Sequence, residues 1–336
     1  MIMNQRLTEV QAFLELHPSY LKRGCGNLSK KFNISKEDVR QIKKNLGFDN
    51  NLRERYKEFI KNHESGLVLE HSEYVIDDKD VLPNILILDI ETAPIRAFVW
   101  RLWKQDIYID QIISDWFMLT WSAKFLGSDI TYSEKLTGKE AVEEDDSRIV
   151  KKLWNLLNDA DMVVAHNGDA FDLPKIRSRF AIHGLPPTTF YHQIDTKKIA
   201  AKEFGFASNK LDALAKSFGI GSKIHTEFEL WSECMKGNDT ALEEMRVYNV
   251  HDVEILEKVY LKLRPYIKNH PNVTFYSTSN AMRCPSCGGK HLYKESFYYT
   301  HASVYQTYRC QDCGALSRDR KSIRKEIKNT NLSLAK

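Results

Sequence analysis

The chain has 336 residues, of which 42% are hydrophobic and 28% are charged. This composition is typical of a folded globular protein and excludes an intrinsically disordered chain, which would have too few apolar residues to form a core. The longest aliphatic run, residues 85–88, is far shorter than the roughly 18 apolar residues of a membrane span, and no signal-peptide pattern is present. We therefore expect an unsecreted protein of about two or three domains that does not bind a membrane.

Charge is distributed unevenly along the chain, although the net charge is only +4. Residues 1–62 hold 13 Lys and Arg against 7 Asp and Glu, a net charge of +6, and residues 281–336 hold 11 against 4, a net charge of +7. The segment between them holds 25 against 34, a net charge of −9. Basic ends around an acidic centre favour the binding of a polyanion such as nucleic acid, with chance segregation of surface charge as the alternative.

Residues 1–50 contain three short helical patterns and no strand pattern. Ser35 is placed to cap the third helix, in which Val39, Ile42 and Leu46 share one face. Four basic side chains are left for the outside of this helix: Lys36, Arg40, Lys43 and Lys44. The pattern predicts a helix-turn-helix-like domain whose last helix would enter a DNA major groove, or else a three-helix cap with a solvated basic face. Residues 51–82 have no sustained period and are predicted to be a linker.

A mixed α/β domain is predicted over residues 83–270. Strand-like runs at 85–91, 118–124 and 162–165 alternate with helical patterns at 149–157, 211–218 and 241–263. Thr240 and Glu243 have the spacing of a capping box at the start of the last helix.

Two carboxylates lie at the end of the first predicted strand. Asp89 and Glu91 follow four aliphatic residues, and side chains at i and i+2 of a strand point to the same face. Two neighbouring carboxylates beside an apolar strand repel each other unless a cation lies between them. The pair therefore indicates a divalent metal site, although a strand with an acidic end at the surface would have the same sequence.

Two further segments carry candidate site residues. In the helix at 241–263, Tyr248 and Asp252 are helix neighbours at i and i+4 and share the face of the apolar residues, so Asp252 needs a partner or a cation. After the strand at 162–165, the loop contains Asn167, Phe171 and Asp172 before a helix. Asp172 is either a metal ligand or an ordinary helix cap, and Asp169 is its rival as the acidic residue of this loop.

The order and spacing of these residues indicate a protein family more specifically than any one residue does. Asp89-x-Glu91, Asn167-x-x-x-Phe171-Asp172 and Tyr248-x-x-x-Asp252 resemble the three exonuclease motifs of the DEDD, or DnaQ-like, superfamily of 3′-to-5′ exonucleases. The tyrosine indicates the tyrosine subtype, which includes the proofreading domains of family B DNA polymerases and stand-alone phage and bacterial relatives. The resemblance covers about residues 83–265 and implies a ribonuclease-H-like fold, a mixed sheet with flanking helices.

The resemblance also implies the chemistry of the site. Two Mg²⁺ or Mn²⁺ ions would be held by four acids and would promote in-line displacement at a phosphodiester bond: Asp89, Glu91, Asp172 and Asp252. Tyr248 would orient the attacking water, and Asn167 and Phe171 would bind the terminal nucleotide. Asp195 would belong to the framework, with a role as an extra acid of the site as the alternative. DNA is the favoured substrate, with RNA as the alternative. The expected partner is a polymerase or another replication or repair protein, with which the exonuclease would act in trans. The expected location is the cytoplasm of a bacterial or phage-infected cell.

Four of the six cysteines form two pairs with metal-ligand spacing, Cys284-Pro-Ser-Cys287 and Cys310-Gln-Asp-Cys313. They resemble the two knuckles of a zinc ribbon over residues 281–317, in which four thiolates bind one structural Zn²⁺, with disulfides as the alternative. The segment between the pairs is rich in aromatic residues: Tyr293, Phe297, Tyr298, Tyr299, Tyr305 and Tyr308. They would either stack on single-stranded bases or form the core of the ribbon. Residues 318–336 are predicted to be a basic tail.

The sequence therefore predicts a metal-dependent 3′-to-5′ exonuclease whose flanking modules bind nucleic acid. One alternative is a transposase-like or resolvase-like endonuclease with a ribonuclease-H-like fold. The pairing of Tyr248 with Asp252 and the position of the ribbon after all four acids argue against it. A second alternative is a DNA-binding regulator whose nuclease fold is inert, and the presence of all four acids argues against that.

Overall fold

The computed structural model describes residues 82–277, 279, 281–301 and 303–323, together with Ser29, Ser35, Asp38, Val39 and Ile42. The chain divides into two compact units, Met1–Asp77 and Asp78–Lys336. In the first unit, the Ser35 hydroxyl accepts a hydrogen bond from the Asp38 amide at 3.1 Å, and Val39 and Ile42 are buried, as expected for a capped helix. The helix-turn-helix, most of the linker and the tail beyond residue 323 are predictions that lie outside the described residues.

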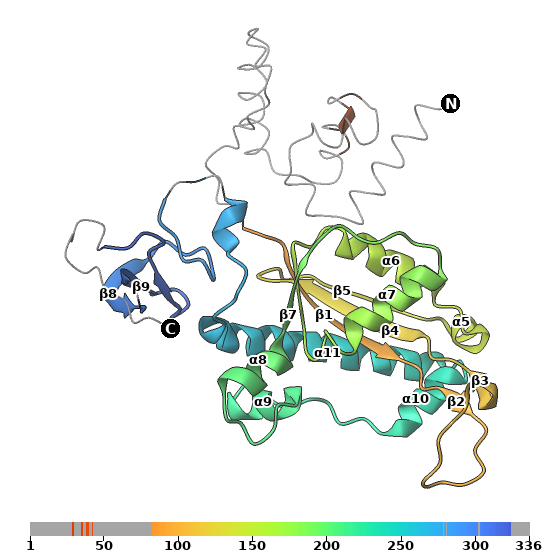
Figure 1. Cartoon of the computed structure of the whole chain (residues 1–336). Coiled ribbons are helices and arrows are strands. Elements are labelled where there is room, and N and C mark those ends of the chain that lie inside the picture. The colour runs from red at the N-terminus through yellow and green to blue at the C-terminus, as the bar shows by residue number, and fades with distance from the viewer. Residues whose placement is uncertain are drawn as a thin grey trace. The chain divides into compact units, whose positions relative to one another are not determined.

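A five-stranded mixed sheet lies at the centre of the second unit (Figure 1). Its strands are β1 (Ile85–Thr92), β4 (Met118–Phe125), β5 (Thr131–Lys135), β6 (Met162–Ala165) and β7 (His192–Asp195), in the order β5-β4-β1-β6-β7. The central strand, β1, pairs antiparallel with β4 and parallel with β6. This mixed sheet with packed helices is consistent with the predicted ribonuclease-H-like fold.

Helices cover both faces of the sheet. They are α5 (Gly138–Glu143), α6 (Ser147–Leu157), α7 (Asp172–Ile182), α8 (Thr196–Glu203), α9 (Leu211–Ser217), α10 (Phe228–Met235) and α11 (Asp239–Leu263), with short 3-10 turns η2 (Ile109–Gln111), η3 (Arg264–Tyr266) and η4 (Val273–Tyr276). Figure 1 shows the long helix α11 along one face, with α6 and α7 on the other. Within the described residues, no helix is both long and apolar enough to cross a membrane.

The start of α11 differs from the prediction. The helix begins at Asp239 and is capped by Asn238, whose side-chain oxygen accepts hydrogen bonds from the amides of Thr240 and Ala241. The predicted capping box of Thr240 and Glu243 is therefore wrong. Asn238 outcompetes it because its carbonyl oxygen already satisfies the free amides of the first turn, and the Glu243 carboxylate instead pairs with Arg246 on the same helix.

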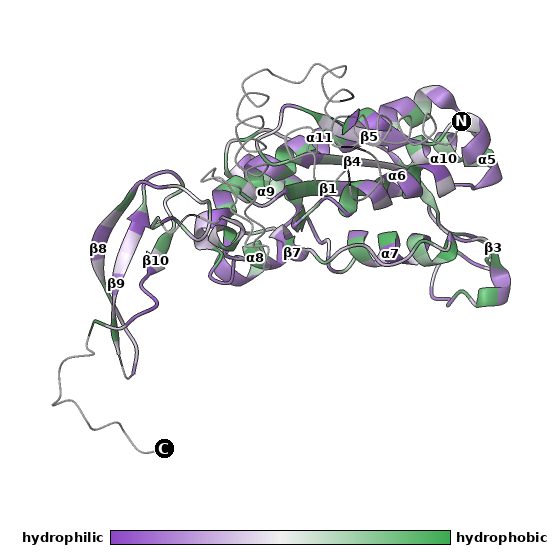
Figure 2. Cartoon of the chain, turned by 90° about the horizontal axis from the view of Figure 1, so that it is seen from above, coloured by the Kyte–Doolittle hydropathy of each residue, from purple (hydrophilic) through white to green (hydrophobic). Residues whose placement is uncertain are grey.

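The alternation of side chains along β1 decides where its carboxylates point. Leu86 and Leu88 belong to the apolar cluster that contains residues of α6 and α7, whereas Ile85 and Ile87 belong to the cluster that contains residues of α9 and α11. Figure 2 shows β1 as a largely hydrophobic strand inside the sheet. Asp89 and Glu91 continue the face of Ile85 and Ile87, so both acids point towards the α11 side.

Two smaller sheets extend from this core. The hairpin of β2 (Arg96–Ala97) and β3 (Ile112–Ser114) carries a connection with very exposed apolar side chains, among them Trp100 at 94% and Trp103 at 79%. The C-terminal sheet contains β8 (Leu292–Tyr299), β9 (Val304–Cys310) and β10 (Leu316–Arg318), in the order β10-β9-β8. Residues after β10 stay bonded to β9, because the amide of Ile323 donates to the carbonyl of Val304 at 3.0 Å.

Asp146 connects the elements on the α6 side of the sheet. Its fully buried carboxylate accepts a hydrogen bond from the amide of Met118 at the start of β4, at 2.8 Å. The same carboxylate binds Arg179 at 2.6 Å and the His183 ring at 2.5 Å, near the end of α7. One side chain thus holds β4, α6 and α7 together.

We expect Asp146→Ala to lower the free energy of unfolding by about 3 kcal/mol, because Arg179, only 9% exposed, would lose its carboxylate partner. Urea unfolding followed by tryptophan fluorescence measures this change. The matched control is Asp145→Ala, at an exposed neighbouring position whose carboxylate accepts one hydrogen bond from the amide of Ser147, for which we expect a loss of only about 1 kcal/mol. Equal losses in the two variants would contradict the role of Asp146.

Candidate active site

Three of the predicted acids converge in space. Carboxylate oxygens of Asp89 and Glu91 on β1 and of Asp252 on α11 lie within 4.8 Å of one another. The strand period places the first two side by side, and the packing of α11 against β1 brings the third to them. Asp252 is fully buried, so its negative charge must be compensated inside the protein.

The fourth predicted acid, Asp172, lies against the same strand without joining this close group. It is the first residue of α7, is 2% exposed, and accepts a hydrogen bond from the amide of Ile90 at 3.2 Å. Its rival Asp169 instead pairs with the Lys198 ammonium at 2.8 Å. Of the two loop acids, Asp172 is therefore the one that shares the environment of Asp89 and Glu91.

Burial and the neighbouring carboxylates strongly affect the pKa values of the acids. Burial, followed by the charge of Asp252, raises the pKa of Glu91 to about 8. Burial also raises the pKa of Asp172 to about 7, and burial together with the charge of Asp172 holds the pKa of Asp89 well above its ordinary value. A set of carboxylates that resists ionisation in this way is stabilised by a cation.

A lysine already supplies one positive charge. The Lys223 ammonium, from the segment between α9 and α10, donates to Asp252 and lies 3.4 Å from the Tyr248 hydroxyl oxygen. Although burial opposes it, the charges of Asp252 and Asp89 raise the pKa of Lys223 above its ordinary value. Sequence reasoning missed this lysine because it lies in a loop, and its carboxylate partners are distant in sequence.

Asn249 was missed as well, although a signal for it existed. Its side-chain amide is fully buried and donates to Asp89 at 2.7 Å. Asn249 lies four residues after Met245 and four before Val253, so it shares the apolar face of α11. A polar side chain on that face needs a polar partner, which is the argument that identified Asp252.

Tyr248 faces the same cluster from α11. Its side chain is 9% exposed and its ring packs edge-on against Trp231, with 6.4 Å between the ring centroids. Burial, followed by the charge of Asp252, raises the pKa of its hydroxyl to about 12. Tyr248 is therefore a neutral hydrogen-bonding group at neutral pH.

The loop before α7 has a structural as well as a candidate binding role. Asn167 adopts a left-handed backbone, its amide donates to Asp195 at 3.0 Å, and its side-chain oxygen accepts from Lys197 at 3.2 Å. Asp195 also accepts from the amide of Lys197 and caps α8, consistent with a framework residue. Phe171 lies just before α7 and is 38% exposed. The binding roles of Asn167 and Phe171 stay predictions.

A cavity of about 570 Å³ adjoins the acids. Its lining residues are Thr92, Ala93, Pro94, Ile95, Trp116, Phe171, Lys175, Phe228 and Trp231. The Lys175 ammonium lies 3.1 Å from the Thr92 hydroxyl and 4.0 Å from the centroid of the Trp116 ring. Phe171 directly precedes Asp172 and Trp231 packs against Tyr248, so this aromatic cavity lies next to residues of the candidate site.

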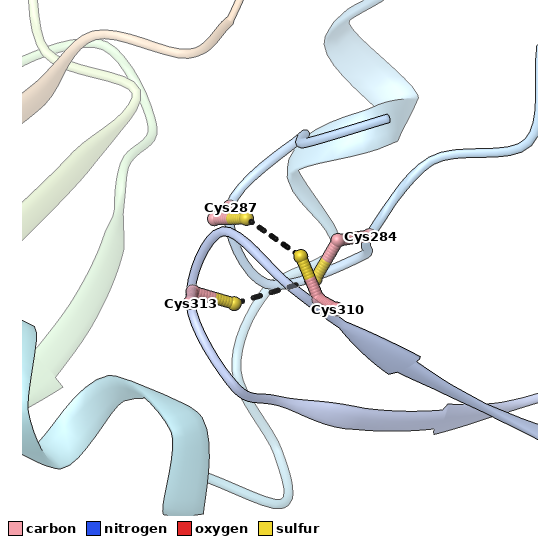
Figure 3. Close-up of side chains that lie close together, drawn as sticks. All are labelled: Cys284, Cys287, Cys310 and Cys313. Atoms are coloured by element: carbon pink, nitrogen blue, oxygen red, sulfur yellow. Dashed lines mark hydrogen bonds between the residues drawn. The ribbon is translucent and has the colours of Figure 1, made fainter. Parts of the chain in front are cut away.

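The four paired cysteines form a second candidate metal centre. Their sulfur atoms lie within 4.8 Å of one another, with 3.6 Å between Cys284 and Cys313 and 3.7 Å between Cys287 and Cys310 (Figure 3). Four sulfurs about 2.3 Å from a zinc ion are separated by roughly 3.8 Å in a tetrahedron, whereas a disulfide requires about 2.05 Å. The arrangement therefore fits four thiolate ligands of one zinc ion.

Comparison with known proteins supports the fold. Residues 126–264 match the RNase_H_2 family model, described as RNase_H superfamily. That range includes Asp172, Tyr248 and Asp252 and begins after β1, which carries Asp89 and Glu91. The second unit thus contains a ribonuclease-H-like α/β domain with a candidate acidic metal site and, after it, a small sheet with a four-cysteine cluster.

Two DNA polymerases are similar to parts of the chain. A DNA polymerase of Methanocaldococcus jannaschii is 24% identical over 175 residues, a match that covers 52% of this chain and 10% of the polymerase. The structure of the family B DNA polymerase from the hyperthermophilic archaeon Pyrobaculum calidifontis is 14% identical with a TM-score of 0.41, and the match covers 67% of this chain and 32% of that one. The chain thus spans only a small part of either polymerase.

Without added Mg²⁺ or Mn²⁺, we expect the acidic cluster to lower stability as the pH rises. The pKa of Glu91 is 4.5 in an exposed carboxyl and about 8 in the folded protein, so its stabilising contribution is complete below 4.5 and is lost as the pH approaches 8. The melting temperature of Glu91→Gln, which cannot ionise, should therefore rise relative to wild type between pH 5 and pH 8, as measured by differential scanning fluorimetry. Parallel curves of melting temperature against pH for the two proteins would contradict this prediction. Added Mn²⁺ should raise the melting temperature of wild type more than that of the variant.

Cys310→Ser should abolish zinc binding, because three thiolates and a hydroxyl leave the tetrahedral site incomplete. We expect wild type to retain one zinc per chain after dialysis and the variant to retain none, as measured by inductively coupled plasma mass spectrometry. Cys234→Ser provides the control, since Cys234 is a buried cysteine outside the cluster. An unchanged zinc content in Cys310→Ser would refute the assignment.

Proposed function

We propose that this protein is a metal-dependent 3′-to-5′ exonuclease of the tyrosine type that hydrolyses phosphodiester bonds of nucleic acid, with DNA as the favoured substrate. The observation that carries the proposal is the convergence of Asp89, Glu91 and Asp252 within 4.8 Å, with Tyr248 facing the same cluster. The first pair of acids and the Tyr248-Asp252 pair are far apart in the sequence, with 157 positions from Glu91 to Tyr248, and their motif spacing predicts that they share one site. The ribonuclease-H-like fold supports the same proposal.

The donor set suits a hard divalent ion. Carboxylate oxygens are the ligands that Mg²⁺ and Mn²⁺ prefer. Within the described residues, one oxygen of Asp252 and the side-chain oxygen of Asn249 are buried without a hydrogen-bond partner. We propose that two such ions are held by Asp89, Glu91, Asp172 and Asp252. Bound ions of this kind activate water and stabilise the charge of the leaving oxygen.

Tyr248, Phe171 and Asn167 position the attacking water and the substrate. The Tyr248 hydroxyl stays protonated at neutral pH and orients the attacking water by hydrogen bonding. Phe171 lines the aromatic cavity beside the acids, where it contacts the terminal nucleotide. Asn167 assists from the same loop, with its side chain supported by Lys197.

The other parts of the chain support delivery of the substrate. The four-cysteine cluster holds one structural Zn²⁺, and the basic ends of the chain attract the phosphate backbone. If the protein removes mismatched ends, it acts in trans with a polymerase or another replication or repair protein.

A nucleic-acid-binding protein without catalysis is the second candidate, and Lys223 is the observation that favours it. Its ammonium compensates the charge of Asp252 inside the cluster, so one of the acids has a partner without any metal. A carboxylate cluster neutralised in this way could be purely structural. Cleavage assays separate the two candidates.

With Mg²⁺ or Mn²⁺, we expect wild type to shorten a 5′-labelled single-stranded oligonucleotide stepwise from its 3′ end. Asp89→Ala and Asp172→Ala should each lower the rate about 100-fold or more, because each removes a metal ligand, and Tyr248→Phe should lower it about 10- to 100-fold. Gel electrophoresis of timed samples measures the rates and the direction of digestion. Asp169→Ala is the matched control, since its carboxylate pairs with Lys198 outside the cluster, and it should keep near wild-type activity.

Other product patterns would overturn the proposal. Internal cuts that are lost in Asp89→Ala and in Asp172→Ala would indicate a transposase-like or resolvase-like endonuclease. If the folded, zinc-containing protein cleaves neither DNA nor RNA in the presence of metal, the second candidate, a nucleic-acid-binding protein without catalysis, is indicated.

A further inference from the structure

The aromatic residues of the C-terminal sheet do not form its core. The buried cluster there consists of Cys284, Cys310 and Ala315, with the other two cysteines and Leu292 packed against it. In contrast, β8 is exposed along most of its length, including Tyr298 at 49%. The cysteine cluster thus organises the fold of this sheet, and the aromatic side chains of β8 remain exposed to solvent.

Three side chains lie together on one face of this sheet, and we call them the tyrosine-arginine platform: the exposed Tyr298 and Arg318 and the half-buried Tyr305. Tyr298 and Tyr305 are direct partners across β8 and β9, so their rings lie on the same face of the sheet. The guanidinium carbon of Arg318, on β10, lies 4.2 Å from the centroid of the Tyr305 ring and 5.4 Å from that of Tyr298. Figure 2 shows β8, β9 and β10 side by side in this order.

The charge of the segment that carries the platform fits a polyanion. Described residues between 281 and 323 include seven Lys and Arg against three Asp and Glu. The three acids are engaged locally: Glu295 binds Arg309, Asp312 binds the His291 ring, and Asp319 accepts from the Tyr308 hydroxyl. The Arg318 side chain, in contrast, is exposed beside the two rings and has no carboxylate partner among the described residues.

We propose that the tyrosine-arginine platform is a docking surface for single-stranded nucleic acid, separate from the candidate active site. Unpaired bases stack on exposed tyrosine rings, and a guanidinium beside them pairs with the backbone phosphate. A base-paired duplex hides its base faces, so it is a poor ligand for this surface. The proposal does not depend on catalysis, because binding is measured in a protein that cannot cleave.

The test uses the full chain with Asp89→Ala as the parent, so that the oligonucleotides stay intact. Fluorescence anisotropy gives the dissociation constants of 5′-labelled 20-nucleotide oligo(dT) and oligo(U), and of a blunt duplex of equal length. Adding Tyr298→Ala and Tyr305→Ala together should weaken single-strand binding about tenfold or more. Arg318→Ala should weaken it and reduce its salt dependence, whereas Arg318→Lys should restore the salt dependence without restoring full affinity.

Tyr299→Ala is the matched control. Tyr299 is the next residue on β8 and is 67% exposed, but it pairs with Val304 and therefore points to the opposite face of the sheet. We expect it to change the dissociation constant less than about twofold, because its ring lies away from the platform. Zinc content verifies that every variant keeps its ribbon folded.

Several results would overturn the proposal. They are an absence of single-strand binding by the parent, unchanged binding after loss of the platform residues, an equal effect of Tyr299→Ala, and duplex binding that is weakened as much as single-strand binding. A change from dimer to monomer in the double tyrosine variant, with binding unchanged, would instead identify the platform as a self-association surface.

Discussion

The structure depends on how four acidic side chains are accommodated around one hydrophobic strand. β1 is the centre of the sheet, and its alternating side chains pack into two apolar clusters on opposite faces. The same alternation places Asp89 and Glu91 where α11 contributes Asp252, so packing that stabilises the fold also brings like charges together. Asn249, Lys223 and the amide of Ile90 offset part of this repulsion. A candidate metal site is thus inseparable from the packing of the domain.

The two candidate metal centres use different chemistry. The acidic cluster has only oxygen donors and adjoins a cavity, as expected for an ion that contacts a substrate. The cysteine cluster offers four sulfur donors, enough to fill the tetrahedral coordination of a zinc ion and leave no position for a substrate. Because oxygen and sulfur donors favour different ions, the two centres of one chain can favour different metals.

Sequence periodicity predicted much of the central domain and of the candidate site. The period of 2 in β1 and the apolar face of α11 placed Asp89, Glu91 and Asp252 correctly on their elements, because local geometry alone determines side-chain direction there. The contacts of Lys223 and of Asp146 with Arg179 were not predicted, since their partners come together only through tertiary packing. The cap of α11 was misplaced because Asn238 and Thr240 are both good caps and only the backbone of the preceding loop decides between them.

Lys223 has a consequence for the loop that carries it. Residues 218–227 connect α9 to α10, and the ammonium of Lys223 holds an oxygen of Asp252. A divalent ion that takes this oxygen must displace the ammonium, so the lysine is an internal competitor whose effective concentration is set by the loop. Ion binding and loop position are therefore linked thermodynamically. An interaction that holds the loop away from Asp252 strengthens ion binding by some factor. Because the linkage is reciprocal, ion binding favours the displaced loop by the same factor.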